Sequence, residues 1–224
     1  MLRQIVLDTE TTGLSPKDGH RIIEIGCLEM VNRRLTGNHF HQYINPEREI
    51  DREAEKVHGI TQKFLEDKPV FSAIAEEFMD FVRGADLIIH NAPFDIGFIN
   101  HELKLLDKKN KPVTASCEVI DTLVMAKQMY PGQKNNLDAL CRRFSVDNTN
   151  RDLHGALLDS ELLAQVYLLM TGGQTQLFDA EQVTTSEETV TGAVQRLSKN
   201  RKPLRVIKAS PEELAAHEAF LEGI

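Results

Sequence analysis

The chain has 224 residues, of which 41% are hydrophobic and 27% charged, and its formal net charge is -8. Such a chain can bury a full core, and its length suits one large domain plus a tail. The acidic balance argues against a protein that grips a long nucleic-acid duplex, because that grip comes from lysine and arginine neutralising phosphates. Any contact with nucleic acid must be short or assisted by a metal ion.

No apolar stretch reaches the length of a membrane span, and residues 1–4 lead into a strand without a signal-peptide pattern. We therefore expect a cytoplasmic protein with no membrane contact. Cys27, Cys117 and Cys141 are widely spaced and form no Cys-x-x-Cys pair. This spacing indicates neither a disulfide framework nor a zinc site, and it favours three buried apolar side chains.

The run Ile5–Leu14 begins with β-branched residues, which indicate a buried strand, and it contains two acidic residues, Asp8 and Glu10. Residues two apart on a strand point the same way, so Asp8 and Glu10 share one face. Two like charges in a partly desolvated site repel each other unless a cation lies between them. Mg²⁺ or Mn²⁺ would suit such oxygen ligands. The alternative is an edge strand with a solvated acidic face, which is commoner for an isolated Asp-x-Glu.

The pattern along the domain predicts an α/β protein. Three consecutive strands, with a connection over 32–37, suggest an antiparallel meander. Residues 87–89 are too few for a helix and indicate a buried parallel strand. The expected strands are 5–11, 21–31, 39–44, 87–89 and 118–121, and the expected helices are 51–57, 61–65, 71–82, 93–106, 122–130, 137–144 and 157–171. Asp51 and Thr61 are the expected caps of the first two helices, and Asn136 or Asn135 starts the helix 137–144.

From Gln174 onward the composition shifts to glutamine, threonine, glutamate and serine, which is typical of a linker. We place a globular domain at 1–172, a flexible linker at 173–186 and a partner-binding tail at 187–224. The tail is too short for a core of its own, so its apolar residues predict a surface for a partner.

Two further acids and a histidine occur at predicted strand ends and helix starts. Asp95 lies just past the short parallel strand, and His154 and Asp159 lie around the start of the last helix. Each alone has an ordinary explanation, such as a carboxylate favoured by a helix dipole or a loop histidine. Together with Asp8 and Glu10 they supply the parts for two cations about 4 Å apart that clamp a phosphodiester. The histidine supplies a base near neutral pH.

The motifs Asp8-x-Glu10, His90–Asp95 and His154 followed by Asp159, in this order and separation, resemble the DEDDh family of 3′–5′ exonucleases. The resemblance covers about residues 4–170. It implies a ribonuclease-H-like fold, with a mixed five-stranded sheet flanked by helices, and hydrolysis of a 3′-terminal nucleotide to a nucleoside monophosphate.

The resemblance also implies a role for each acidic residue. Asp8, Glu10 and Asp159 would be direct ligands of two Mg²⁺ or Mn²⁺ ions, with Asp8 bridging both. Asp95 would hold the second ion through water. His154 would take a proton from the attacking water.

Substrate contacts follow from the same resemblance. Leu14, after the turn at Gly13, and His58 would contact the terminal base and sugar of a single-stranded 3′ end of DNA. They would bind substrate together with the three direct ligands of the ions. For Leu14 and His58 the alternative is packing in the core.

The tail resembles that of the family members that edit for a replicative polymerase, in the segments 172–175, 204–206 and 213–218. The resemblance implies that 187–224 bind the polymerase's alpha subunit, and it leaves open whether a small theta-like subunit attaches. Within 174–178, Gln174, Leu177 and Phe178 resemble the short peptide that docks in a sliding clamp. The alternative is that the Leu-Phe pair folds back on the domain.

Three functions are compatible with these features. We expect a proofreading exonuclease that removes mismatched 3′-terminal nucleotides. A freestanding DEDDh exonuclease acting on RNA or single-stranded DNA is the first alternative, but such an enzyme needs no polymerase tether. A scaffold that chiefly joins polymerase and clamp is the second, and a complete set of acids argues against a purely structural role.

Overall fold

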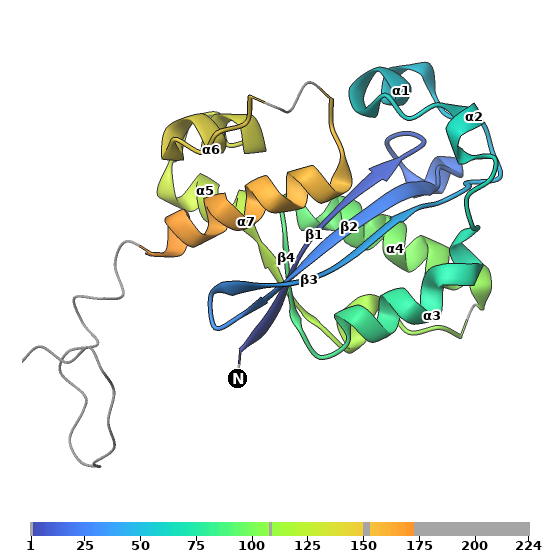
Figure 1. Ribbon diagram of the computed structural model, residues 1–224, viewed down its shortest axis with the longest axis horizontal. Coiled ribbons are helices and arrows are strands. Elements are labelled where there is room, and N and C mark those ends of the chain that lie inside the picture. Colours follow the sequence, from blue (N-terminus) through green and yellow to red (C-terminus); the bar gives the residue numbers. More distant parts are fainter. Residues whose placement is uncertain (1, 108, 150–152, 173–224) are drawn as a thin grey trace, which may run out of the picture. The chain divides into compact units, whose positions relative to one another are not determined.

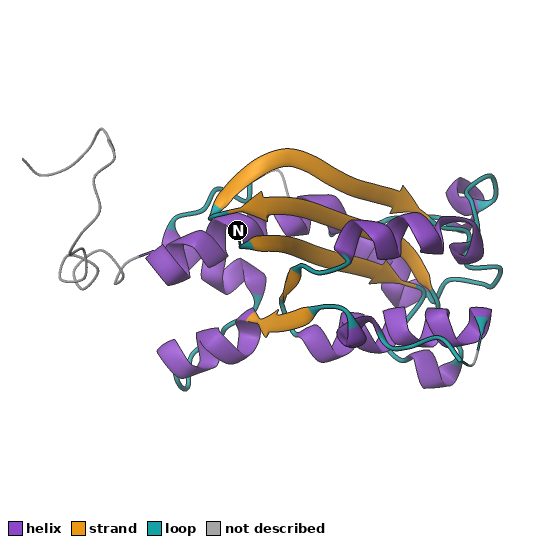
Figure 2. Cartoon of the chain, turned by 90° about the horizontal axis from the view of Figure 1, so that it is seen from below, coloured by secondary structure: helices purple, strands orange, loops and turns teal. Residues whose placement is uncertain are grey.

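The computed structural model describes residues 2–107, 109–149 and 153–172. A five-stranded sheet has the order β3-β2-β1-β4-β5, and Figure 2 shows three long strands side by side with the two short ones beyond them. Neighbours β1, β2 and β3 are antiparallel, whereas β1, β4 and β5 are parallel, which confirms the mixed sheet. The strands are β1 Arg3–Thr11, β2 Ile22–Val31, β3 Arg34–Tyr43, β4 Asp86–Ile89 and β5 Glu118–Asp121.

Helices cover both faces of the sheet (Figure 1). One core packs α3 and α4 against the sheet, and a second core packs α5, α6 and α7 against the opposite face. The helices are α1 Arg52–His58, α2 Gln62–Leu65, α3 Phe71–Val82, α4 Ala92–Leu106, α5 Thr122–Met129, α6 Leu137–Phe144 and α7 Ala156–Gly172, with 3-10 turns at Pro16–Asp18 and Val113–Ala115.

The central strand β1 is buried on both faces and decides which side chains meet which helices. Ile5 and Leu7 belong to the core beside α3 and α4, whereas Val6 belongs to the core beside α7. Because side chains alternate along a strand, Asp8 and Glu10 follow Val6 onto the face of α7. Thr9 follows Leu7 onto the face of α4.

The predicted hairpin between the second and third strands is present, but its connection is shorter than the predicted 32–37. Strand β3 begins at Arg34, and the turn is confined to Asn32 and Arg33, which have left-handed φ values of 49° and 65°. Asparagine tolerates this conformation, but arginine does so less readily. The Arg33 guanidinium donates to the Thr171 hydroxyl at 2.6 Å and the Leu168 carbonyl at 3.0 Å, so the far end of α7 holds the turn in place.

Helix capping matches the sequence pattern in two cases out of three. The side chains of Thr61 and Asn136 accept hydrogen bonds at the starts of α2 and α6, as predicted. Asp51 occupies the capping position of α1, but its side chain makes no capping bond. Its carboxylate lies 3.5 Å from His20 Nε2 instead, so it joins α1 to the loop after β1.

All three cysteines are buried free thiols, as the sequence predicts. Within the described part of the chain, no helix has the length and apolar character needed to cross a membrane. The predicted linker 173–186 and partner-binding tail 187–224 lie outside the described residues.

Candidate active site

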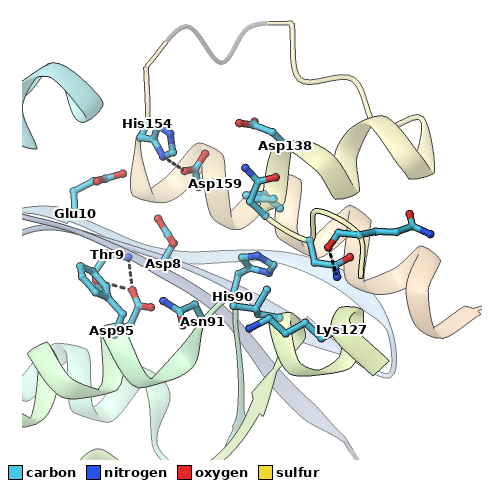
Figure 3. Close-up of a pocket in the computed structure, with 16 residues that line it drawn as sticks. Asp8, Thr9, Glu10, His90, Asn91, Asp95, Lys127, Asp138, His154 and Asp159 are labelled. Atoms are coloured by element: carbon cyan, nitrogen blue, oxygen red, sulfur yellow. Dashed lines mark hydrogen bonds and ion pairs between the residues drawn. The ribbon is translucent and has the colours of Figure 1, made fainter. Parts of the chain in front are cut away.

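A pocket of about 500 Å³ opens where the ends of β1 and β4 face the start of α7. Among the residues that line it are all five predicted catalytic residues: Asp8, Glu10, Asp95, His154 and Asp159. In Figure 3, Asp8 and Glu10 project from β1 toward His154 and Asp159, and Asp95 lies near Thr9. The fold therefore brings together residues separated by some 150 positions in the sequence.

The start of α7 supplies a histidine and a carboxylate. Asp159 lies in the first helical turn and is 3% exposed, a place where the helix dipole favours a negative charge. His154 Nδ1 lies 3.2 Å from Asp159 Oδ2, and the backbone N–H of His154 donates to the Val57 carbonyl at 3.1 Å. The imidazole is 43% exposed, so a substrate entering from solvent can reach it.

Glu10, His154 and Asp159 form a group that fits a metal ion. Each offers one ligand atom, and the three atoms all lie within 4.8 Å of one another. Two carboxylates and an imidazole at this separation suit a divalent cation, because the ion offsets the repulsion between the acids. Asp8 lines the same pocket, on the same face of β1 as Glu10.

Asp95 lies outside that group of three. It is in the first turn of α4 and is 2% exposed. One carboxylate oxygen accepts hydrogen bonds from the backbone N–H and the hydroxyl of Thr9, at 3.1 and 2.6 Å. Burial raises the pKa of Asp95 to about 7, although the bonds from Thr9 act in the opposite direction. A nearby cation would restore the charged form of this carboxyl.

The two residues predicted to contact the nucleotide line a neighbouring pocket of about 410 Å³, which also reaches Glu10. Leu14 is 86% exposed, so it does not pack in the core. The loop that carries it is tight, because a side chain on Gly13 would collide with the His20 ring.

His58, by contrast, is only 5% exposed. Its Nδ1 accepts the backbone N–H of Ile60 at 3.0 Å, and burial lowers the pKa of the imidazole. The neutral ring therefore carries its proton on Nε2. That nitrogen is buried and makes no hydrogen bond of standard geometry among the described residues, although the Thr11 backbone acts to raise the pKa of the ring.

Other pocket residues were not singled out from the sequence. Asn91 follows β4 with a left-handed φ of 70°, and Lys127 and Asn135 line the side of the pocket formed by the α5 region. Asn135 donates to the carbonyls of Tyr130 and Gln133, so it also holds its own loop. Only the position of Asn91 directly after a predicted strand could have indicated its place in the site.

Comparisons with known proteins agree with this fold. A family model described as exonuclease, RNase T, matches residues 5–167. By structure, the chain is similar to Exonuclease X in complex with 5′ overhanging duplex DNA (TM-score 0.60, 24% identity, 76% of this chain and 92% of that one). It is also similar to Escherichia coli Exonuclease I in complex with a dT13 oligonucleotide (TM-score 0.67, 18% identity, 80% and 43%). At these identities the likeness shows the fold alone.

Relatives with a similar sequence show to which group of exonucleases the chain belongs. The chain is 53% identical to DNA polymerase III subunit epsilon of Escherichia coli K12, over 98% of this chain and 92% of the relative. It is also 53% identical to the subunit epsilon of Rickettsia felis, over 100% and 97% of the two chains. The chain belongs to the metal-dependent exonuclease family and, within it, to the epsilon subunits of DNA polymerase III, which are 3′–5′ proofreading exonucleases.

Proposed function

We propose that this exonuclease cleaves the last phosphodiester of a single-stranded 3′ DNA end with Asp8, Glu10 and Asp159 as direct ligands of two divalent ions. Asp95 would hold the second ion through water. When bound, Mg²⁺ or Mn²⁺ would supply Lewis-acid stabilisation of charge on the attacking and leaving oxygens. The observation that carries the proposal is that Glu10 and Asp159 converge, with oxygens within 4.8 Å of each other and of a His154 nitrogen, in the pocket that Asp8 also lines.

His154 is the proposed general base. Its Nδ1 lies 3.2 Å from Asp159 Oδ2, so a proton on Nδ1 donates to that carboxylate. Nε2 is then the atom that accepts the proton of the attacking water. A positioned base of this kind contributes about 10²-fold to 10⁴-fold to a rate.

The terminal nucleotide is proposed to occupy the pocket shared by Leu14, His58 and Glu10. The exposed Leu14 side chain offers an apolar surface to the base, and His58 Nε2 offers a donor to the sugar. The protein's net charge of -8 disfavours a long grip on a duplex, so only a few unpaired nucleotides need to bind.

A test uses DNA primers labelled at the 3′-terminal nucleotide, one mismatched and one paired, with matched RNA alongside, in Mg²⁺ and in chelator. The mismatched end should be cut faster, since a mismatch has already lost part of the stacking and pairing energy that extrusion costs. Equal rates on both DNA primers would contradict proofreading. Faster cutting of the RNA would favour the freestanding enzyme, and full activity in chelator would contradict the metal-dependent site.

The proposed partners are the DNA polymerase III alpha subunit, bound by 187–224, and the sliding clamp, bound by Gln174, Leu177 and Phe178. These contacts would hold the nuclease near the primer end, in the cytoplasm. A short tether over 173–186 would give a local concentration of about millimolar. A theta-like accessory subunit is a third candidate partner.

Titration of purified alpha subunit and clamp against two variants tests these contacts separately. A chain ending at Gly173 should still digest free single strands but lose the alpha subunit. Leu177→Ala with Phe178→Ala should weaken only the clamp contact, because both apolar anchors are removed. Full alpha binding by the truncated chain would show that the contact lies on another segment.

A further inference from the structure

Glu24 is a buried carboxylate on β2 that is not among the described residues lining the active-site pocket. It is 2% exposed. One of its oxygens lies 2.7 Å from His41 Nε2 on β3, and the other accepts the backbone N–H of Ala156 at 3.2 Å. Ala156 is the first residue of α7, so Glu24 joins β2 to the start of the helix that carries Asp159.

The start of α7 packs directly on the backbone of β2. A side chain on Gly26 would collide with the backbone of Ala156 and Leu157, so only glycine allows this approach. One turn further on, the Ser160 hydroxyl donates to the Gly26 carbonyl at 2.9 Å. The helix start is therefore held at two points on β2, by the Glu24 carboxylate and by the Gly26 carbonyl.

These contacts bear on catalysis because of what precedes and follows Ala156. His154 lies two residues before it and Asp159 three residues after it. Catalytic groups must be held within about 0.5 Å of the productive geometry. The bond from Glu24 fixes the first turn of α7, and the bond from the His154 N–H to the Val57 carbonyl fixes the segment before it.

We propose that Glu24 is a positioning residue for the exonuclease reaction, which through its bond to the Ala156 N–H places His154 and Asp159 opposite Asp8 and Glu10. The proposal rests on the proposed function, because it needs His154 and Asp159 to act in the reaction. Glu24 itself need not touch the substrate.

Glu24→Ala should lower kcat on a labelled single-stranded oligonucleotide by roughly 10²-fold, the cost of a displacement of about 1 Å in a catalytic group. KM should change less than kcat, because Glu24 does not line the pocket of Leu14 and His58 and acts there only through its charge, which raises the pKa of His58. Glu24→Gln should retain most of kcat, since the amide oxygen can still accept the Ala156 N–H. Glu24→Asp should lose more than Glu24→Gln, because its shorter side chain cannot reach.

Glu29→Ala is the matched control. Glu29 lies on the same strand and its carboxylate also accepts hydrogen bonds, but from Arg3, Thr36 and Asn38. None of these belongs to α7. The control should keep kcat even if its melting temperature falls, whereas an equal loss of kcat in Glu29→Ala would show a general effect of damaging β2 and overturn the positioning role.

A double-mutant cycle with His154→Ala separates positioning from a purely structural effect. If Glu24 acts through His154, Glu24→Ala should cost much less in the His154→Ala background than in the unmutated protein. Losses that multiply independently would show that Glu24 does not act through His154 and would overturn that half of the proposal. Hydrogen exchange at the Ala156 amide, which should be faster in Glu24→Ala, gives a readout that does not depend on activity.

The two proposals fail in different ways. Full activity of His154→Ala would overturn the proposed base and, with it, the positioning role. Loss of activity in His154→Ala together with full kcat in Glu24→Ala would overturn the positioning role alone. If Glu24→Ala does not fold, as judged by its thermal melt, the comparison of Glu24→Asp with Glu24→Gln decides instead.

Discussion

Helix α4 carries two buried carboxylates, Asp95 and Glu102, that are 2% and 1% exposed and are stabilised in different ways. Glu102 meets a full cation: the Arg21 guanidinium donates to both of its oxygens at 2.7 Å, and the backbone N–H of Ile22 adds a third bond. Asp95 accepts its bonds from the neutral donors of Thr9.

The difference separates a structural carboxylate from a functional one. The hydrogen bond to Glu102 raises the pKa of Arg21, so the guanidinium stays charged, and its two bonds pin the start of β2 to α4. Asp95 instead has a pKa raised to about 7 by burial. A divalent ion in the pocket would give Asp95 the counter-charge that Arg21 gives Glu102.

The strongest way to test this contrast is to remove a pocket carboxylate. Asp159→Ala, and likewise Asp8→Ala, should lower digestion of a labelled DNA primer by at least roughly 10³-fold, the upper range for a single charge-stabilising group. The unfolding free energy should not fall, because repulsion among the acids is relieved. Chemical denaturation in chelator measures this second effect.

Near-normal digestion by either variant would contradict the assignment of ligands. A large fall in the unfolding free energy of either variant would also contradict the assignment of ligands, because the carboxylate would then stabilise the fold, as Glu102 does. Glu161→Ala, on the exposed side of α7, is the matched control and should change neither quantity.

A second variant removes the positive charge of Arg21 from its ion pair with Glu102. Arg21→Gln should destabilise the protein by about 3 kcal/mol, because the Glu102 carboxylate stays buried without its counter-charge. Digestion per folded molecule should be kept at a temperature below the melt. Urea unfolding and a primer assay on the same preparation would check this, and unchanged stability would show that Arg21 and Glu102 are not the stabilising pair that the geometry indicates.

Much of the site could be predicted from the sequence because its signals are local. The alternation along β1 places Asp8 and Glu10 on one face without knowledge of the rest of the fold. The capping residues Thr61 and Asn136 likewise act within three residues of themselves. For these elements, the interactions that determine the local structure join residues that are close in the sequence, so the sequence pattern reveals them.

What could not be predicted depends on contacts between distant segments. The bond between Thr9 and Asp95 spans 86 residues, that between Glu24 and Ala156 spans 132, and the pair of Arg21 with Glu102 spans 81. The tight turn at Arg33 depends on the end of α7. No short stretch of sequence contains both partners of these bonds. The sequence pattern therefore predicts which acidic residues lie in the site, but not which groups form hydrogen bonds or ion pairs with them.

The last prediction concerns the pKa of Asp95. A carboxyl whose pKa is raised in the folded state adds stability that is fully present below its unfolded value, 3.8, and is lost as the pH rises through about 7. Asp95→Asn can keep the bonds from Thr9 but cannot ionise. In chelator its stability relative to the unmutated protein should therefore improve between pH 4 and pH 8, by roughly 4 kcal/mol at about 1.4 kcal/mol per pKa unit.

Adding Mg²⁺ or Mn²⁺ at pH 8 should reverse this difference, because an ion that binds only the folded state stabilises it by mass action and binds best where Asp95 is charged. The measurement is thermal or urea unfolding of both proteins at several pH values, with and without the ion. A stability difference that does not change with pH would mean that Asp95 is ionised throughout and has a counter-charge within the chain. It would then resemble Glu102 after all.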